Sequence, residues 1–180
     1  MYDIYVKDLL LQARYRKTPL IVFDCETTGL KPSECHIIQL AGKVLNPIDL
    51  SVTKEFNFYL NPGYELPDKI VELTGITDED LQDKPTEDEI FDNIYHIFGN
   101  YPFVIGHNVS FDNGFMEEMY KRQGWEYNPT SICTCKMARE LLTLPNHKLQ
   151  TVANYYGINV DFHRADADVE ATYRIFVEML

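Results

Sequence analysis

The sequence has little positive charge and no long apolar runs. Lysine and arginine together number 16, against 28 aspartates and glutamates, so the 180 residues carry a formal net charge of −12. No apolar run approaches membrane-spanning length, and the stretch Leu9–Leu11 is too short for the core of a signal peptide. We therefore expect no membrane partner and a cytoplasmic location.

The cysteines are also few, and they lack the CxxC spacing that is typical of zinc sites. The chain has four of them, at Cys25, Cys35, Cys133 and Cys135. We interpret them as reduced thiols of a cytoplasmic protein. A zinc site built from Cys133, Cys135 and a histidine is the alternative that this spacing leaves open.

The shortage of basic residues bears on nucleic-acid binding. Proteins that bind nucleic acid usually carry a basic footprint, and this chain as a whole does not. Either the acidity only keeps the protein soluble, or divalent cations bound in one cleft attract phosphate locally. Only the second interpretation requires divalent metal, so an experiment can separate the two.

The chain shows no internal repeat, low-complexity segment or linker, and its length fits one domain, so we expect residues 1–180 to form a single domain. Apolar patterning predicts strands at 21–23, 36–45, 53–60, 103–105 and 132–135, and helices within 5–17 and at 68–74, 86–98, 111–122, 136–142, 149–156 and 166–180. Strands first, then strands alternating with helices, predict an α/β fold with a mixed sheet flanked by helices.

The stretch Ile21–Gly29 (IVFDCETTG) places two acidic residues at the end of an apolar strand. Because side chains alternate between the faces of a strand, Asp24 and Glu26 point to the same side. Two carboxylates there repel each other and lose hydration, so we expect a positive group between them, most simply a pair of hard divalent cations. The alternative is a strand whose acids merely reach solvent at its edge.

A third acid follows the short strand at 103–105, in the sequence GHNVSFD. On the helix that begins near residue 111, Asp112 shares a face with Phe115 and Met119, so we expect its carboxylate to point inward. The alternative is an ordinary first-turn acid that the helix dipole favours. His107 and Asn108, which precede it, are either substrate contacts or turn residues.

A fourth acid, Asp168, lies five residues after His163 near the start of the last helix. The two converge if His163 lies in the preceding loop and Asp168 in the first helical turn. Asp168 then heads the apolar face that continues with Ile175, whereas Asp166 falls on the other side and is expected to cap the helix or face solvent. The alternative for His163 is an ordinary surface residue.

Three separate segments thus each bring acid to the place where the sheet ends and the helices begin, which is where open sheets with helices bind ligands. Four carboxylates and one histidine suit hydrolysis of a phosphodiester by two divalent ions roughly 3.5–4 Å apart. Histidine titrates near neutrality, so His163 is the candidate base for the attacking water. Carboxylate oxygens are the ligands that Mg²⁺ prefers, and we expect Mn²⁺ to substitute.

The segments FDCETTG, GHNVSFD and HRADAD resemble, in order, the three motifs of the DEDD exonucleases of the histidine subtype. The pattern is similar to the proofreading epsilon subunit of bacterial DNA polymerase III and its relatives. It covers the chain from about Leu20 to Leu180, with residues 1–17 as an N-terminal extension outside it. The resemblance implies a ribonuclease H-like fold with a mixed five-stranded sheet, and 3′-to-5′ removal of nucleoside monophosphates.

The resemblance also implies roles for the motif residues. Asp24, Glu26, Asp112 and Asp168 match the metal ligands of the family, and Asp24 matches the acid that bridges both metal ions. His163 matches the general base. All five therefore count as catalytic candidates.

Five further residues match positions that line the terminal-nucleotide pocket of the family. They are Thr27, Thr28, Leu30, Asn108 and Phe111. We expect the substrate to be the 3′ end of single-stranded DNA. Two bound Mg²⁺ ions leave the net charge negative, so we expect weak binding over a short footprint.

Two alternatives stay open. The same chemistry acts on RNA or short oligoribonucleotides in some relatives, and the contacts to the 2′-hydroxyl that decide this cannot be predicted from sequence. The second alternative is a non-catalytic subunit that serves a DNA polymerase, although the presence of all five catalytic candidates disfavours it. The sequence leaves open whether a polymerase is a partner, because no long tail follows Leu180 as in many polymerase-tethered relatives.

Overall fold

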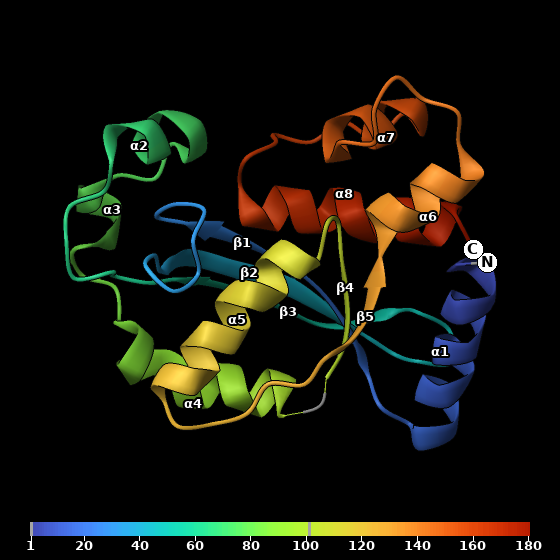
Figure 1. The fold of residues 1–180 in the computed structure, drawn as a ribbon, viewed down its shortest axis with the longest axis horizontal. Coiled ribbons are helices and arrows are strands. Elements are labelled where there is room, and N and C mark those ends of the chain that lie inside the picture. Colours follow the sequence, from blue (N-terminus) through green and yellow to red (C-terminus); the bar gives the residue numbers. More distant parts are fainter. Residues whose placement is uncertain (1, 101) are drawn as a thin grey trace.

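A mixed five-stranded sheet forms the centre of the computed structural model, which describes residues 2–100 and 102–180 (Figure 1). Residues 1 and 101, which belong to the predicted domain, lie outside that part. The strands are β1 (Leu20–Thr27), β2 (Ile37–Leu45), β3 (Val52–Tyr59), β4 (Phe103–Gly106) and β5 (Thr130–Cys133), in the spatial order β3-β2-β1-β4-β5. β1, β2 and β3 pair antiparallel, whereas β4 runs parallel to both β1 and β5. The predicted mixed α/β sheet is confirmed.

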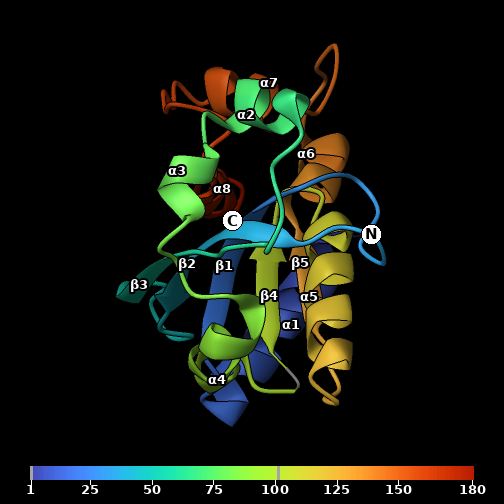
Figure 2. The same ribbon diagram turned by 90° about the vertical axis from the view of Figure 1, so that its left-hand side faces the viewer.

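Helices cover both faces of this sheet (Figures 1 and 2). They are α1 (Tyr2–Arg16), α2 (Asp68–Thr74), α3 (Asp78–Leu81), α4 (Glu87–Phe98), α5 (Ser110–Arg122), α6 (Thr134–Leu141), α7 (Leu149–Tyr155) and α8 (Ala165–Glu178). Within the described residues, none of these helices is both long and apolar enough to span a bilayer.

The alternation of side chains along β1 explains the two layers. Leu20 and Val22 belong to the core that packs against α1, α6, α7 and α8, whereas Ile21 and Phe23 belong to the core beneath α4 and α5. β1 is therefore apolar on both faces until its last residues, where the acids begin. This places the end of β1 between two helical layers.

Two details differ from the sequence prediction. The short helix α3 was not expected; a capping box in which Thr77 and Asp80 bond each other's backbone N–H groups stabilises it. β5 ends at Cys133 and α6 begins at Thr134, so the predicted strand 132–135 was wrong at its end. The reason is tertiary, because the Thr134 hydroxyl lies 2.9 Å from Nδ1 of His107 and holds the start of α6 against the end of β4.

Candidate active site

The end of β1 presents two carboxylates toward α8. Asp24 and Glu26 pair with Ala41 and Gln39 of β2, and they continue the β1 face that packs against α8. The oxygen atoms that Asp24, Glu26 and Asp168 offer all lie within 4.8 Å of one another. The prediction that the two β1 acids share a face, and that Asp168 joins them, is confirmed.

Asp168 lies in the first turn of α8 and is only 8% exposed. Its Oδ2 accepts a hydrogen bond of 3.3 Å from the backbone N–H of His163. Its Oδ1 is buried and has no hydrogen-bond partner among the described residues. A buried carboxylate oxygen without a partner is costly, so it marks a place that a cation would satisfy.

Asp112 approaches the same place from α5, on the other side of β1. It is 3% exposed, and its Oδ1 accepts a hydrogen bond of 3.1 Å from the backbone N–H of Cys25. Asp112 is not part of the closest group of three, but its charge raises the pKa of Asp24, and the charge of Glu26 raises the pKa of Asp112. The three segments therefore bring all four predicted acids together, three of them in direct contact range.

Burial and mutual repulsion make these carboxyl groups weak acids. Burial first, and then the charge of Asp168, raises the pKa of Glu26 to about 7. Burial raises the pKa of Asp112 to about 7 and that of Asp168 to about 6, although backbone hydrogen bonds oppose both shifts. The pKa of Asp24 is raised well above its ordinary value by burial and by its three acidic neighbours. Such a group of acids is unfavourable unless a positive charge joins it.

The residues present fit divalent cations. The donors are carboxylate oxygens, which suit Mg²⁺ and Mn²⁺, and the unpartnered Oδ1 of Asp168 offers an immediate ligand. All four cysteines are free thiols, and Cys135 Sγ donates to the carbonyl of His147 at 3.3 Å. Among the described residues, no three cysteine and histidine ligands come together, so the structure gives the zinc alternative no support.

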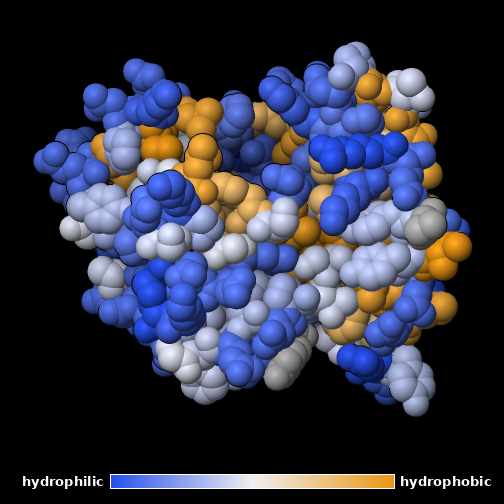
Figure 3. All heavy atoms as spheres, viewed as in Figure 1, coloured by the Kyte–Doolittle hydropathy of each residue, from blue (hydrophilic) through white to orange (hydrophobic). Residues whose placement is uncertain are grey.

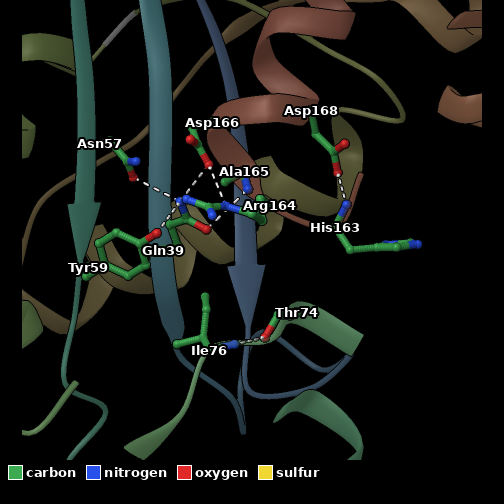
Figure 4. Close-up of polar contacts among 10 residues, drawn as sticks. All are labelled: Gln39, Asn57, Tyr59, Thr74, Ile76, His163, Arg164, Ala165, Asp166 and Asp168. Carbon is green, nitrogen blue, oxygen red and sulfur yellow. Dashed lines mark hydrogen bonds and ion pairs between the residues drawn. The ribbon is translucent and has the colours of Figure 1, made fainter. Parts of the chain in front are cut away.

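His163 lies in the loop just before α8, as predicted, with an exposed side chain. Its backbone has φ +70°, a left-handed conformation that is uncommon for a residue other than glycine. Its imidazole ring extends away from the Asp168 carboxylate, while its backbone N–H points toward it (Figure 4). The loop therefore turns the backbone of His163 toward Asp168 and leaves its ring exposed to solvent.

The five candidate substrate residues divide into two kinds. The Thr27 hydroxyl donates to the carbonyl of Gly29 within the turn, at 2.7 Å, and the Thr28 hydroxyl lies 2.7 Å from the hydroxyl of Tyr64, after β3. Leu30 is 82% exposed, and Asn108 is exposed with φ +66°. Phe111 is half-buried and packs its ring 5.0 Å from that of Phe115.

Sequence reasoning missed a cleft of about 690 Å³ beside the His163 loop. Its walls are the loop after α2 and the segment before α8, with Tyr59, Phe162 and Arg164 among the lining residues. The surface is hollowed between the α2 and α7 regions on the face drawn in Figure 3. The available sequence signal was weak, because Gly75 and Ile76 between two acidic segments indicate only a turn.

Gln39 is a residue of this region that the sequence analysis did not identify. It is a fully buried polar residue within the apolar run IIQLA, and that contrast is a signal the sequence does carry. Asp166, predicted to cap α8 or face solvent, keeps 42% of its side chain exposed, and its Oδ1 also lies 3.3 Å from Nε2 of Gln39, a contact that was not predicted.

Comparison with known proteins places this site in a family context. Residues 21–176 match the family model RNase_T, described as Exonuclease. The PolC-type DNA polymerase III of Bacillus cereus is 38% identical over 163 residues, which cover 89% of this chain and 11% of that protein. The corresponding protein of Staphylococcus haemolyticus is 34% identical over 168 residues, covering 92% of this chain and 12% of that protein. This chain therefore spans only about a ninth of these relatives.

Solved structures share the fold. Escherichia coli Exonuclease I in complex with a dT13 oligonucleotide has a TM-score of 0.77 and 21% identity, over 88% of this chain and 40% of that chain. Exonuclease X in complex with 5′ overhanging duplex DNA has a TM-score of 0.68 and 24% identity, over 89% and 90%. These likenesses confirm the ribonuclease H-like fold class that the motifs implied.

Proposed function

Because the chain belongs to this exonuclease family, we propose that it removes nucleoside monophosphates one at a time from the 3′ end of single-stranded DNA. The observation that carries the proposal is the convergence of Asp24, Glu26 and Asp168 on one point, with Asp112 beside them. Burial raises the pKa values of all three, and the charge of Asp168 raises those of Asp24 and Glu26 further, as expected of acids that bind cations.

The metal proposal is specific. Two Mg²⁺ ions would supply the positive charge that activates a water molecule and stabilises the leaving 3′ oxygen. As the family resemblance implies, Asp24 would be a ligand of both ions, and Asp168 would bind through the oxygen that has no partner. Glu26 and Asp112 would complete the ligand set from the two sides of β1.

The chain's own residues would do the remaining work. His163 would accept the proton of the attacking water at a ring nitrogen, since its ring is exposed on the rim of the site. Leu30 and Phe111 would contact the terminal nucleotide, while Thr27 and Thr28 would hold the β1–β2 turn and Asn108 the start of α5 in shape. The helical layers on both sides of β1 would limit water around the acids.

We assign residues 1–180 to a single exonuclease domain, with 1–17 as an extension. The support is that Val6, Leu9 and Ala13 of α1 lie in the same core as β1 and α8. The PolC-type relatives favour a DNA polymerase as the partner, either in the same polypeptide or as a separate chain. Four free cysteines favour the cytoplasm.

The test is release of mononucleotides from a 3′-labelled single strand. We expect release with Mg²⁺ or Mn²⁺, none with EDTA, and none from the Asp24→Ala variant. Activity that survives Asp24→Ala would remove the two-metal mechanism. A matched strand of RNA in the same assay decides between the DNA proposal and the exoribonuclease alternative.

A further inference from the structure

Gln39 is a completely buried amide in the middle of the apolar strand β2. It lies opposite Glu26 in the pairing with β1 and opposite Tyr59 in the pairing with β3. Directly paired residues of antiparallel strands point to the same face, so the Gln39 side chain is on the face that α8 covers. Burying an amide is costly unless its hydrogen bonds are made, so its partners indicate what it does.

Those partners define one orientation of the amide (Figure 4). Oε1 accepts a hydrogen bond of 3.2 Å from the backbone N–H of Ala165. Nε2 lies 3.0 Å from Asn57 Oδ1, 3.2 Å from the Tyr59 hydroxyl and 3.3 Å from Asp166 Oδ1. Reversing the amide would turn its oxygen toward these acceptors and its amino group toward the Ala165 N–H, so the network permits one orientation only.

The bond to Ala165 replaces a missing helix cap. The first N–H groups of a helix have no partner within it, and the N-cap residue usually supplies one from its side chain. Arg164, the N-cap residue of α8, makes no such bond. Gln39, which lies 126 residues earlier in the chain, supplies the acceptor instead. The first turn of α8 is thereby tied to the sheet.

That first turn carries the polar groups on which the site depends. Asp168 lies three residues after Ala165, and its Oδ2 accepts the His163 N–H while its Oδ1 stays unpartnered. His163 keeps a backbone of φ +70°, and such a conformation persists where the surrounding structure fixes it. A shift of the turn would move the Asp168 carboxylate and the His163 ring together.

We propose that Gln39 is a positioning residue: through Ala165 and Asp166 it fixes the first turn of α8, and so sets Asp168 and His163 relative to the acids of β1. Gln39 does not touch substrate, because it is fully buried. The proposal rests on the proposed function in that the site it shapes is the metal-binding exonuclease site.

The test exchanges the charges of Gln39 and Asp166. Gln39→Glu keeps an acceptor for the Ala165 N–H but sets a second carboxylate against Asp166. Adding Asp166→Asn to Gln39→Glu restores a donor opposite an acceptor, with the same total charge as the natural pair. Asn57→Ala is the matched control, since it removes a partner of the same amide that belongs to β3 and not to α8.

Three readouts at pH 8 serve all variants: Mn²⁺ affinity by calorimetry, hydrogen exchange of the segment 161–168 in EDTA, and kcat and KM for mononucleotide release. We expect Gln39→Glu to weaken Mn²⁺ binding by about 10–100-fold, to speed exchange in 161–168, and to lower kcat more than it raises KM. The Mn²⁺ affinity and kcat of the double variant should return to within about threefold of those of the natural protein. Both quantities should stay near the natural values in Asn57→Ala.

Each possible result supports or overturns the positioning role of Gln39. Unchanged Mn²⁺ affinity and exchange in Gln39→Glu, or a double variant no better than the single one, would overturn the positioning role while leaving the exonuclease proposal intact. Loss and recovery of Mn²⁺ binding in a protein that releases no nucleotide would support the role of Gln39 and defeat the proposed function. A natural protein that binds no Mn²⁺ would overturn both.

Discussion

At the scale of single residues, His163 combines an unusual backbone with an exposed ring. Its left-handed φ is better tolerated by asparagine than by alanine, so His163→Asn removes the base with little strain. We expect this variant to lower kcat by about 10²–10⁴-fold, the usual contribution of a general base. Mn²⁺ affinity should not change, because the backbone N–H that Asp168 accepts is retained.

The control for that variant is His96→Ala, in an exposed position in the last turn of α4. It should leave both kcat and metal affinity as they are. A rate that does not respond to His163→Asn would mean that another group takes the proton.

Glu26 gives a prediction about pH. Its pKa is raised from 4.5 to about 7, so the metal-free folded protein binds this proton more tightly than the unfolded chain does. The protonated group costs no stability near pH 4. The penalty grows as pH rises from about 4.5 to about 7, and above that it levels off at a value on the order of 3 kcal/mol. In EDTA, the free energy of unfolding of Glu26→Gln should therefore equal that of the natural protein near pH 4 and exceed it at pH 8.

Urea unfolding across this pH range measures the difference. Saturating Mg²⁺ at pH 8 should reverse the order, because the metal stabilises the protein that holds all its ligands. A gap between the two proteins that does not depend on pH would contradict the raised pKa of Glu26.

At this scale the sequence predicted the acids but not their partners. The two-residue period of a strand was enough to place Asp24 and Glu26 on one face, and helical spacing was enough to turn Asp112 and Asp168 inward. The role of Gln39 depends on a residue 126 positions away, and local periodicity carries no information at that distance. The contact between Gln39 and Asp166 was missed for the same reason.

At the scale of elements, α1 lies outside the match to the family model yet belongs to the main core. Leu9 is 4% exposed and Leu11 is 62% exposed on the same helix. We expect Leu9→Ala to lower the free energy of unfolding by about 2–4 kcal/mol, and Leu11→Ala by less than about 0.5 kcal/mol.

Urea unfolding provides the measurement, with kcat as a second readout. Because the acids lie on other elements, kcat of Leu9→Ala should equal that of the natural protein below its unfolding transition. A large loss of kcat without a loss of stability would mean that α1 acts on the site itself.

Strong periodicity let the sequence predict most elements. β2, β3 and the long helices α4, α5 and α8 appeared close to their predicted bounds, whereas β1 continued to Thr27, beyond its predicted end at residue 23. α3 has only four residues and depends on its capping box, so it shows no period to detect. The boundary between β5 and α6 is set by the contact of Thr134 with His107, which is again a tertiary effect.

At the scale of the whole molecule, the net charge of −12 and the acid cluster point to the same requirement. An acidic protein whose site contains four mutually repelling carboxyl groups needs cations to approach a polyanion. The described residues supply oxygen ligands at one place, where the sheet meets helices from both of its faces. We propose that this place binds a pair of divalent ions.

The most direct measurement is a crystal structure of the protein grown with Mn²⁺, with data collected at the manganese absorption edge. We predict two anomalous peaks between Asp24, Glu26, Asp112 and Asp168, about 3.5–4 Å apart, with Asp24 touching both. Crystals of Asp24→Ala should lose at least one of the peaks. No peak at this place, or manganese bound only elsewhere on the surface, would contradict the account.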